Sequence, residues 1–243
     1  MCELFTVKSD ENIPIEWIFH YAKLLEEYGF AGFGWGMAWK CEDGQIRRYR
    51  AIEGVRNDIL APQTLKGIVS KEYLVHLRRP SLMKSMAFNN SQPYLNEDQS
   101  LAFAHNGYFK NHDQYRSFYA NELAGTSDSE VGYRYYLMKL NEQKDPIISL
   151  ELTHQILEGN ANLIAFRKNE VTLLYAGNND NKMYTFNLGG VRCASTSLHS
   201  QDDYLFQAIF PTATNIKQIP LFTGCELTFG QLENKSYKES SMK

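Results

Sequence analysis

The chain has 243 residues, of which 43% are hydrophobic and 22% are charged. This is the composition of a globular protein, and the length is sufficient for a large buried core. A net charge of −3 argues against nucleic acid or an anionic membrane as the partner. No apolar run is long enough to span a bilayer and no signal-peptide core is present, so we expect a cytoplasmic protein.

The early elements are predicted to be strands with one helix among them. Residues 2–7 are expected to form a short strand. Residues 15–28 are expected to form an amphipathic helix, because apolar side chains recur at helical spacing and Gly29 follows them. Residues 34–40 and 45–53 are predicted to pair as a hairpin.

The second half of the chain is predicted to contain two helices followed by strands. One helix begins after Ser127, which forms a capping-box pattern with Glu130, and the next runs through residues 149–159. Buried strands are expected at residues 71–79, 99–107, 162–168, 171–177, 182–188 and 191–197. Segregated strands and helices favour an α+β fold in layers over a doubly wound parallel sheet, and residues 1–243 show no linker, so one domain is predicted.

The four cysteines are scattered, which fits neither a disulfide framework nor a zinc site, and we expect no metal or organic cofactor. Cys2 has two interpretations. A free cysteine in a strand is usually a small buried apolar residue. If Met1 is removed, however, Cys2 carries a thiol nucleophile and an α-amine with a pKa of about 7.7–8.0 that can serve as its base.

Three further stretches offer the groups that such a nucleophile needs to attack an amide. Asn106 and Gly107 form either a hairpin turn or a pair of oxyanion donors. Arg78 and Arg79 are either solvated charges or a fork for a carboxylate, and strand alternation lets only one of them face a given pocket. Asp128 either complements a helix dipole or accepts an ammonium group.

The glycine-dense stretch at residues 32–36 surrounds Trp35, a candidate substrate-binding residue. It lacks the context of a dinucleotide site, which leaves close backbone packing or a closing loop as its role. His105 is a candidate pocket residue because it adjoins Asn106. For His76 and His199, we expect a satisfied structural role.

Together and in this order, the motifs "MCELF", "GFGWGMAW", "HLRRPS", "AHNGYF" and "SDSE" resemble the glutaminase domain of class II glutamine amidotransferases, which are N-terminal-nucleophile hydrolases. The resemblance covers about residues 2–200. It implies a four-layer αββα sandwich in which two antiparallel sheets pack between helices.

The resemblance also implies roles for individual residues. Cys2 would attack a γ-carboxamide, and Asn106 with Gly107 would form the oxyanion hole. Arg78 would bind the α-carboxylate of the glutamyl group, and Asp128 its α-ammonium. At the position after Arg78, better-known members carry Trp-Ala-Thr, whereas this chain has Arg79, Pro80 and Ser81.

Three functions are consistent with these observations. The first is a stand-alone hydrolase of glutamine or of a small γ-glutamyl compound, which proceeds through a Cys2 thioester. The second is a glutaminase subunit that delivers ammonia to a separate synthase. The third is a non-catalytic binding module that keeps the fold. The sequence leaves a homodimer and a synthase open as partners and does not indicate which amide is the substrate.

Overall fold

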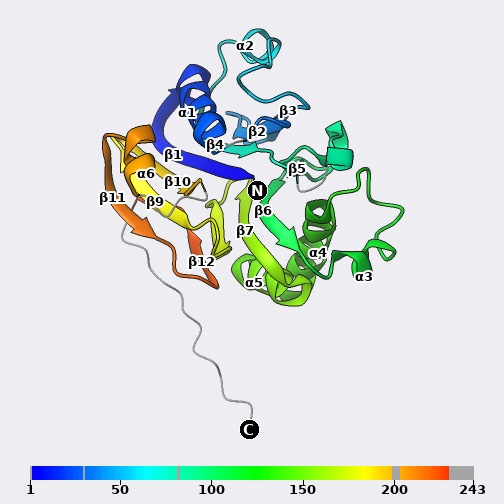
Figure 1. Cartoon of the computed structure of the whole chain (residues 1–243). Coiled ribbons are helices and arrows are strands. Elements are labelled where there is room, and N and C mark those ends of the chain that lie inside the picture. The colour runs from blue at the N-terminus through cyan, green and yellow to red at the C-terminus, as the bar shows by residue number, and fades with distance from the viewer. Residues whose placement is uncertain (1, 30, 81–82, 199–202, 230–243) are drawn as a thin grey trace.

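In the computed structural model, which describes residues 2–29, 31–80, 83–198 and 203–229, two antiparallel sheets pack face to face (Figure 1). The larger sheet contains, in spatial order, β11 (Ala213–Gln218), β9 (Met183–Leu188), β10 (Val191–Thr196), β1 (Glu3–Pro14), β4 (Val69–Leu77), β2 (Trp35–Lys40) and β3 (Ile46–Ala51). The smaller sheet contains β12 (Thr223–Glu226), β8 (Leu173–Gly177), β7 (Gly159–Arg167), β6 (Leu101–Phe109) and β5 (Tyr94–Leu95).

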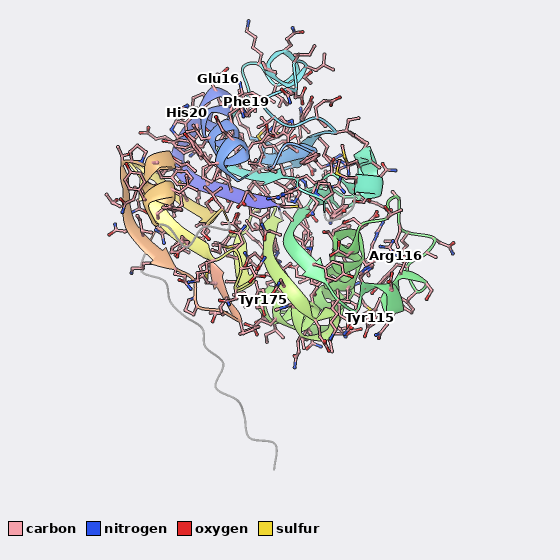
Figure 2. All side chains as sticks on the ribbon, in the orientation of Figure 1. Glu16, Phe19, His20, Tyr115, Arg116 and Tyr175 are labelled. Carbon is pink, nitrogen blue, oxygen red and sulfur yellow. The ribbon has the colours of Figure 1, made fainter. Side chains whose placement is uncertain are left out.

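Helices cover the outer face of each sheet. The larger sheet is covered by α1 (Ile15–Tyr28) and α6 (Asp203–Ile209), and the smaller by α4 (Asp128–Gln143) and α5 (Pro146–Leu157). The short helices are α2 (Ala61–Thr64), α3 (His112–Arg116) and two 3₁₀ turns at Met83–Ser85 and Phe88–Asn90. In Figure 2, Phe19 and His20 mark α1 on one side of the molecule, and Tyr115 and Arg116 mark α3 on the other. The predicted four-layer αββα sandwich is confirmed.

Apolar side chains fill the space between each pair of layers. Along β1, Leu4 joins the apolar layer between the sheets, whereas Phe5 joins the layer beneath α1. This alternation follows from the two-residue period of a strand. It also means that the side chain of Cys2, which has the same parity as Leu4, faces the space between the sheets. No helix among the described residues is both long and apolar enough to cross a membrane.

Most predicted elements are present. Asn106 and Gly107 lie within β6, paired with Asn162 and Ala161 of β7, which agrees with the predicted strand and excludes the alternative of a hairpin turn. The capping box is only half formed. Ser127 accepts the backbone N–H of Ser129, but the Glu130 carboxylate accepts from Ala124 and Gly125.

His76 lies on β4 between the sheets and is completely buried. Within the described ranges, neither ring nitrogen has a hydrogen-bond partner of normal geometry, so the satisfied role expected from sequence is wrong. Burial, together with the charges of Arg78 and His105, lowers the pKa of His76 to about 3, and an interaction with the His105 backbone opposes the shift. The folded protein therefore holds a neutral imidazole.

We predict that His76→Leu stabilises the protein against acid. A histidine whose pKa is depressed by folding takes up its proton more readily when unfolded, so wild type loses stability as pH falls from about 6.5 toward 3. The free energy of unfolding of the variant should gain roughly 1–2 kcal/mol on wild type between pH 8 and pH 5. Denaturant titrations at both pH values measure this change. His20→Leu, at an exposed position on α1, is the control, and an equal gain in that variant would contradict the assignment to His76.

Candidate active site

Cys2 lies at the leading end of β1, next to the end of β4. Glu3 pairs with Leu77 in the ladder, which places Cys2 beside Arg78 and Arg79. The backbone N–H of Arg79 donates to the Cys2 sulfur over 3.5 Å, and the thiol lies 3.8 Å from the Arg79 carbonyl oxygen. The Cys2 thiol is thus held by the backbone of Arg79, where the start of β1 lies beside the end of β4.

The electrostatic surroundings of Cys2 act in opposite directions. Burial raises the pKa of the thiol, whereas the Arg79 N–H and the Arg78 guanidinium lower it. A thiol is nucleophilic only as the thiolate, so attack at neutral pH requires a base to remove the proton. Met1 lies outside the described residues.

Asn106 reaches Cys2 from the other sheet. It is completely buried on β6, and its Nδ2 donates to the Cys2 carbonyl oxygen in a short contact. The neighbouring Gly107 has a φ of 149°, and a Cβ at this position would lie 1.8 Å from the carbonyl oxygen of Asn160. Only glycine fits there, because any side chain would collide with β7 backbone.

A turn between the sheets completes the surroundings of Asn106. Asn178 donates from Nδ2 to Asn106 Oδ1 over 3.0 Å and so fixes which end of the Asn106 amide faces Cys2. Asn181 donates from Nδ2 to the Cys2 carbonyl oxygen over 3.3 Å. No functional role was predicted for this "GNNDN" stretch, because nothing in its local pattern reports its partners on β1 and β6.

Glu3 was also missed. Its side chain is completely buried, and its Oε2 accepts from Asn181 Nδ2 over 3.1 Å and from the Thr196 hydroxyl in a short contact. Burial raises the pKa of Glu3 to about 7, and the bonds from Thr196 and Asn181 oppose that shift. Because strand neighbours point to opposite faces, Glu3 reaches Cys2 through the Asn181 amide and not directly.

Arg78 is buried and Arg79 is exposed, in agreement with the expected alternation. Nη2 of Arg78 donates to the Ser85 carbonyl oxygen over 2.7 Å and to its hydroxyl over 3.1 Å. The other N–H groups of the guanidinium lie on Nε and Nη1. The Arg78 side chain is therefore held at one end by the segment that contains Ser85.

Asp128 is the first residue of α4, and its side chain is 18% exposed. Its Oδ2 accepts the backbone N–H of Phe109 over 2.9 Å. Both Asp128 and Arg78 act electrostatically on the buried hydroxyl of Tyr94, whose pKa is raised mainly by burial. Arg78 follows β4, and Asp128 begins a helix of the opposite layer.

His105 and Trp35 are both completely buried. His105 Nδ1 lies 3.0 Å from the Ser129 hydroxyl, and Nε2 lies 3.2 Å from the Asn160 carbonyl oxygen. Burial lowers the pKa of His105, and Asp128 opposes that shift. Trp35 packs in the layer beneath α1 and donates from Nε1 to Asp58 over 2.9 Å. Because these contacts occupy both rings, we assign neither residue to substrate binding.

The glycine-dense stretch packs tightly against Arg78, which fits the first of its two expected roles. The Phe33 N–H donates to the Arg78 carbonyl oxygen over 3.1 Å, and the Arg78 N–H donates to the Gly34 carbonyl oxygen over 2.8 Å. Gly34 has a φ of 119°, and a Cβ there would lie 3.1 Å from the Ser91 hydroxyl. Ser81 and His199 lie outside the described residues.

A cavity of about 650 Å³ opens beside Arg79, lined also by Gly32, Phe33, Arg56, Asn57 and Met83. The lining also includes Glu26 and Glu27 of α1 but not Cys2, and Arg79 points to the opposite face of the strand from Arg78, so we do not assign this cavity to the candidate site. No cluster of three or more His, Cys, Asp or Glu side chains suited to a metal ion occurs within the described part of the chain.

Comparisons with known proteins bear on the family and the fold of the chain. The sequence profile described as "Glutamine amidotransferases class-II" matches residues 1–186. No curated protein sequence matches the chain.

Solved structures with the same fold differ in how much of their own length they share with the chain. Glutamine phosphoribosylpyrophosphate amidotransferase from B. subtilis, solved with ADP and GMP, matches with a TM-score of 0.70 and 16% identity over 93% of this chain and 47% of that one. This chain thus spans about half the length of that enzyme.

Two further structures are covered almost completely. One is a glutamine aminotransferase class-II domain protein from Silicibacter pomeroyi, with a TM-score of 0.59 and 15% identity over 93% of this chain and 94% of that one. The other is a predicted glutamine amidotransferase from Pseudomonas aeruginosa, with a TM-score of 0.54 and 12% identity over 96% of this chain and 100% of that one. At these identities the likeness shows the fold alone.

We predict that Glu3→Gln changes the pH dependence of stability. A carboxyl whose pKa is raised to about 7 by folding contributes stability at low pH that is lost as pH rises through that value. The neutral amide has no such loss. The free energy of unfolding of the variant should therefore gain roughly 1–3 kcal/mol on wild type between pH 5 and pH 8. Denaturant titrations at the two pH values measure the difference.

Glu72→Gln is the matched control, because Glu72 forms an ion pair with Lys40 at 3.0 Å and the variant loses this pair. The free energy of unfolding of this variant should fall below that of wild type at pH 8, whereas Glu3→Gln should gain on wild type as pH rises to 8. If both variants responded alike, the special environment assigned to Glu3 would be wrong.

Proposed function

Because the chain belongs to the class II glutamine amidotransferases, we propose that it hydrolyses the γ-amide of glutamine or of a small γ-glutamyl compound through a Cys2 thioester. Members of this family are typically cysteine amidohydrolases with an N-terminal nucleophile. The observation that carries the proposal is the convergence on Cys2 of Arg79 backbone from one sheet and the Asn106 amide from the other.

The reaction begins once removal of Met1 frees the Cys2 amine. The neutral amine takes the thiol proton, and the thiolate attacks the carbonyl carbon of the γ-amide. A carbon–sulfur bond forms as the carbonyl oxygen takes up negative charge. The ammonium on Cys2 then gives its proton to the leaving nitrogen as the carbon–nitrogen bond breaks. Water attacks the thioester, with the amine again as base, and releases glutamate and the free thiol.

The oxyanion is stabilised by Asn106 and Gly107 in this proposal. The Asn106 Nδ2 has two hydrogens, one of which is directed at the Cys2 carbonyl oxygen. The second is available to the substrate oxygen, along with the backbone N–H of Gly107. A donor of this kind typically lowers the barrier by about 3–4 kcal/mol. Asn178 keeps the NH₂ end of Asn106 facing the thiol.

Arg78 and Asp128 bind the two charged groups on the α-carbon of the glutamyl moiety. The Arg78 guanidinium pairs with the α-carboxylate, and Asp128 accepts the α-ammonium. Water is the acceptor for a stand-alone enzyme of this type, and neither metal nor organic cofactor takes part in the proposed chemistry.

We predict that Cys2→Ala lowers glutamate release by at least ~10³-fold, because the variant lacks the nucleophile. The substitution replaces one small side chain by another, so thermal unfolding should stay close to wild type. Mass spectrometry of reactions with glutamine and a panel of γ-glutamyl peptides measures the product. The intact mass of the wild-type protein must show Met1 removed. Normal turnover by the variant would refute the mechanism.

We predict that Arg78→Ala raises KM for glutamine about 10–100-fold, with a smaller effect on kcat, because it removes a charged hydrogen-bond donor to the α-carboxylate. Arg79→Ala is the matched control: it removes the adjacent, exposed guanidinium and leaves the backbone at Cys2 in place. Initial rates over a range of glutamine concentrations give both constants. A normal KM in Arg78→Ala with a raised KM in Arg79→Ala would move the carboxylate contact to Arg79.

A further inference from the structure

Asn90 joins the segment that holds Arg78 to the start of the helix that carries Asp128. It lies at the end of the 3₁₀ turn Phe88–Asn90 and its side chain is 1% exposed. Its Nδ2 donates to the Ser85 carbonyl oxygen over 2.8 Å, the same oxygen that accepts from Arg78 Nη2 over 2.7 Å. The Ser85 carbonyl oxygen thus accepts hydrogen bonds from both Arg78 and Asn90.

The amide oxygen of Asn90 accepts hydrogen bonds from the segment that precedes α4. Its Oδ1 accepts the backbone N–H of Thr126 over 2.8 Å and that of Ser127 over 3.0 Å. Nδ2 also donates to the Thr126 hydroxyl over 3.0 Å. Ser127 is the N-cap of α4, and Asp128 follows it directly. The amide of Asn90 uses both of its hydrogens and both lone-pair directions of its oxygen.

The absence of a side chain at Gly125 makes room for the Asn90 amide. A Cβ on Gly125 would lie 2.2 Å from Asn90 Oδ1, so a side chain at that position would displace the Asn90 amide. From the helix side, the Glu130 carboxylate accepts the backbone N–H of Ala124 over 2.9 Å and of Gly125 over 2.8 Å. The segment before Asp128 is therefore fixed from both sides, and Asn90 supplies the side that faces Ser85 and Arg78.

We propose that Asn90 is a positioning residue that sets the spacing between Arg78 and Asp128 and so selects substrates with a free α-carboxylate and a free α-ammonium. This inference rests on the proposed function for the roles of those two charged groups. Two opposite charges on one α-carbon require an anion and a cation at a fixed separation, and a buried amide bonded to both supports supplies it. Glutamine residues within a protein chain, which lack both charges, are excluded.

The test compares glutamine with 4-carbamoylbutanoate, which has the same amide and carboxylate but no α-ammonium. Asn90→Ala should raise KM for glutamine by about 10-fold or more, since bonds to both charged arms are loosened. The ratio of kcat/KM for glutamine to that for 4-carbamoylbutanoate should fall by a smaller factor, because both compounds share the loosened Arg78 contact and glutamine alone also loses the Asp128 contact, while kcat stays within about 3-fold of wild type. A purely structural role would lower kcat/KM for both compounds alike and leave the ratio unchanged.

Asn89→Ala is the matched control. Asn89 donates to the Ala124 carbonyl oxygen over 2.9 Å, so it links the same two segments through a bond that involves neither Ser85 nor Ser127. We expect this variant to keep the wild-type ratio. Thr126→Val, which removes one acceptor of Asn90, should shift the ratio in the same direction by a smaller factor and serves as the test if Asn90→Ala does not fold.

A binding measurement separates this inference from the proposed function. Calorimetric titration of glutamine and of 4-carbamoylbutanoate into Cys2→Ala, with and without Asn90→Ala, needs no turnover. A greater loss of binding for glutamine than for 4-carbamoylbutanoate in the double variant supports the inference even if wild type releases no glutamate. An unchanged preference for glutamine in a folded Asn90→Ala protein, by kinetics or by calorimetry, overturns it.

Discussion

The register of β1 is the constraint on which the candidate site depends. β1 hydrogen-bonds to β4 on one side and to β10 on the other, with Glu3 opposite Leu77 and Phe5 opposite Ser195. Burial of Leu4 between the sheets and of Phe5 beneath α1 specifies this register. A shift by one residue would exchange the two faces, and Cys2 would then point away from Asn106. The packing of two apolar layers thus determines where the thiol lies.

The candidate site exists only where the two sheets meet. The larger sheet brings Cys2 and Arg78, and the smaller brings Asn106 and, through the helix packed on it, Asp128. The turn between β8 and β9 passes from one sheet to the other and bonds to both, through Asn178 to Asn106 and through Asn181 to Cys2. Buried amides are costly unless their hydrogen bonds are satisfied. These bonds, each shared with a group of the site, therefore fix its geometry as well as its stability.

The sequence predicted those features that depend on local pattern. Apolar spacing located α1, and the order of the motifs singled out Cys2, Arg78 and Asp128 as candidates. The Asn106–Gly107 pair was ambiguous because the same dipeptide suits a turn and a strand end, and only pairing with β7 decides between them. Glu3, Asn90 and the amides of the β8–β9 turn act through partners far away in the chain. Nothing in their immediate neighbours reports those partners, so local reasoning could not have assigned them.

Two separate sets of hydrogen bonds position the candidate nucleophile and the side chains proposed to bind the α-carboxylate and the α-ammonium. Asn178, Asn181 and Glu3 surround Cys2 and Asn106, whereas Asn90 joins the supports of Arg78 and Asp128. These hydrogen bonds between described residues fall into one set or the other. Free energies of substitutions in separate networks tend to add, whereas those within one network do not. Substrate preference can therefore change through Asn90 and its partners while the geometry around the thiol is kept. With the roles proposed above, this separation gives a physical reason why one fold could accept different γ-glutamyl compounds with the same thiol chemistry.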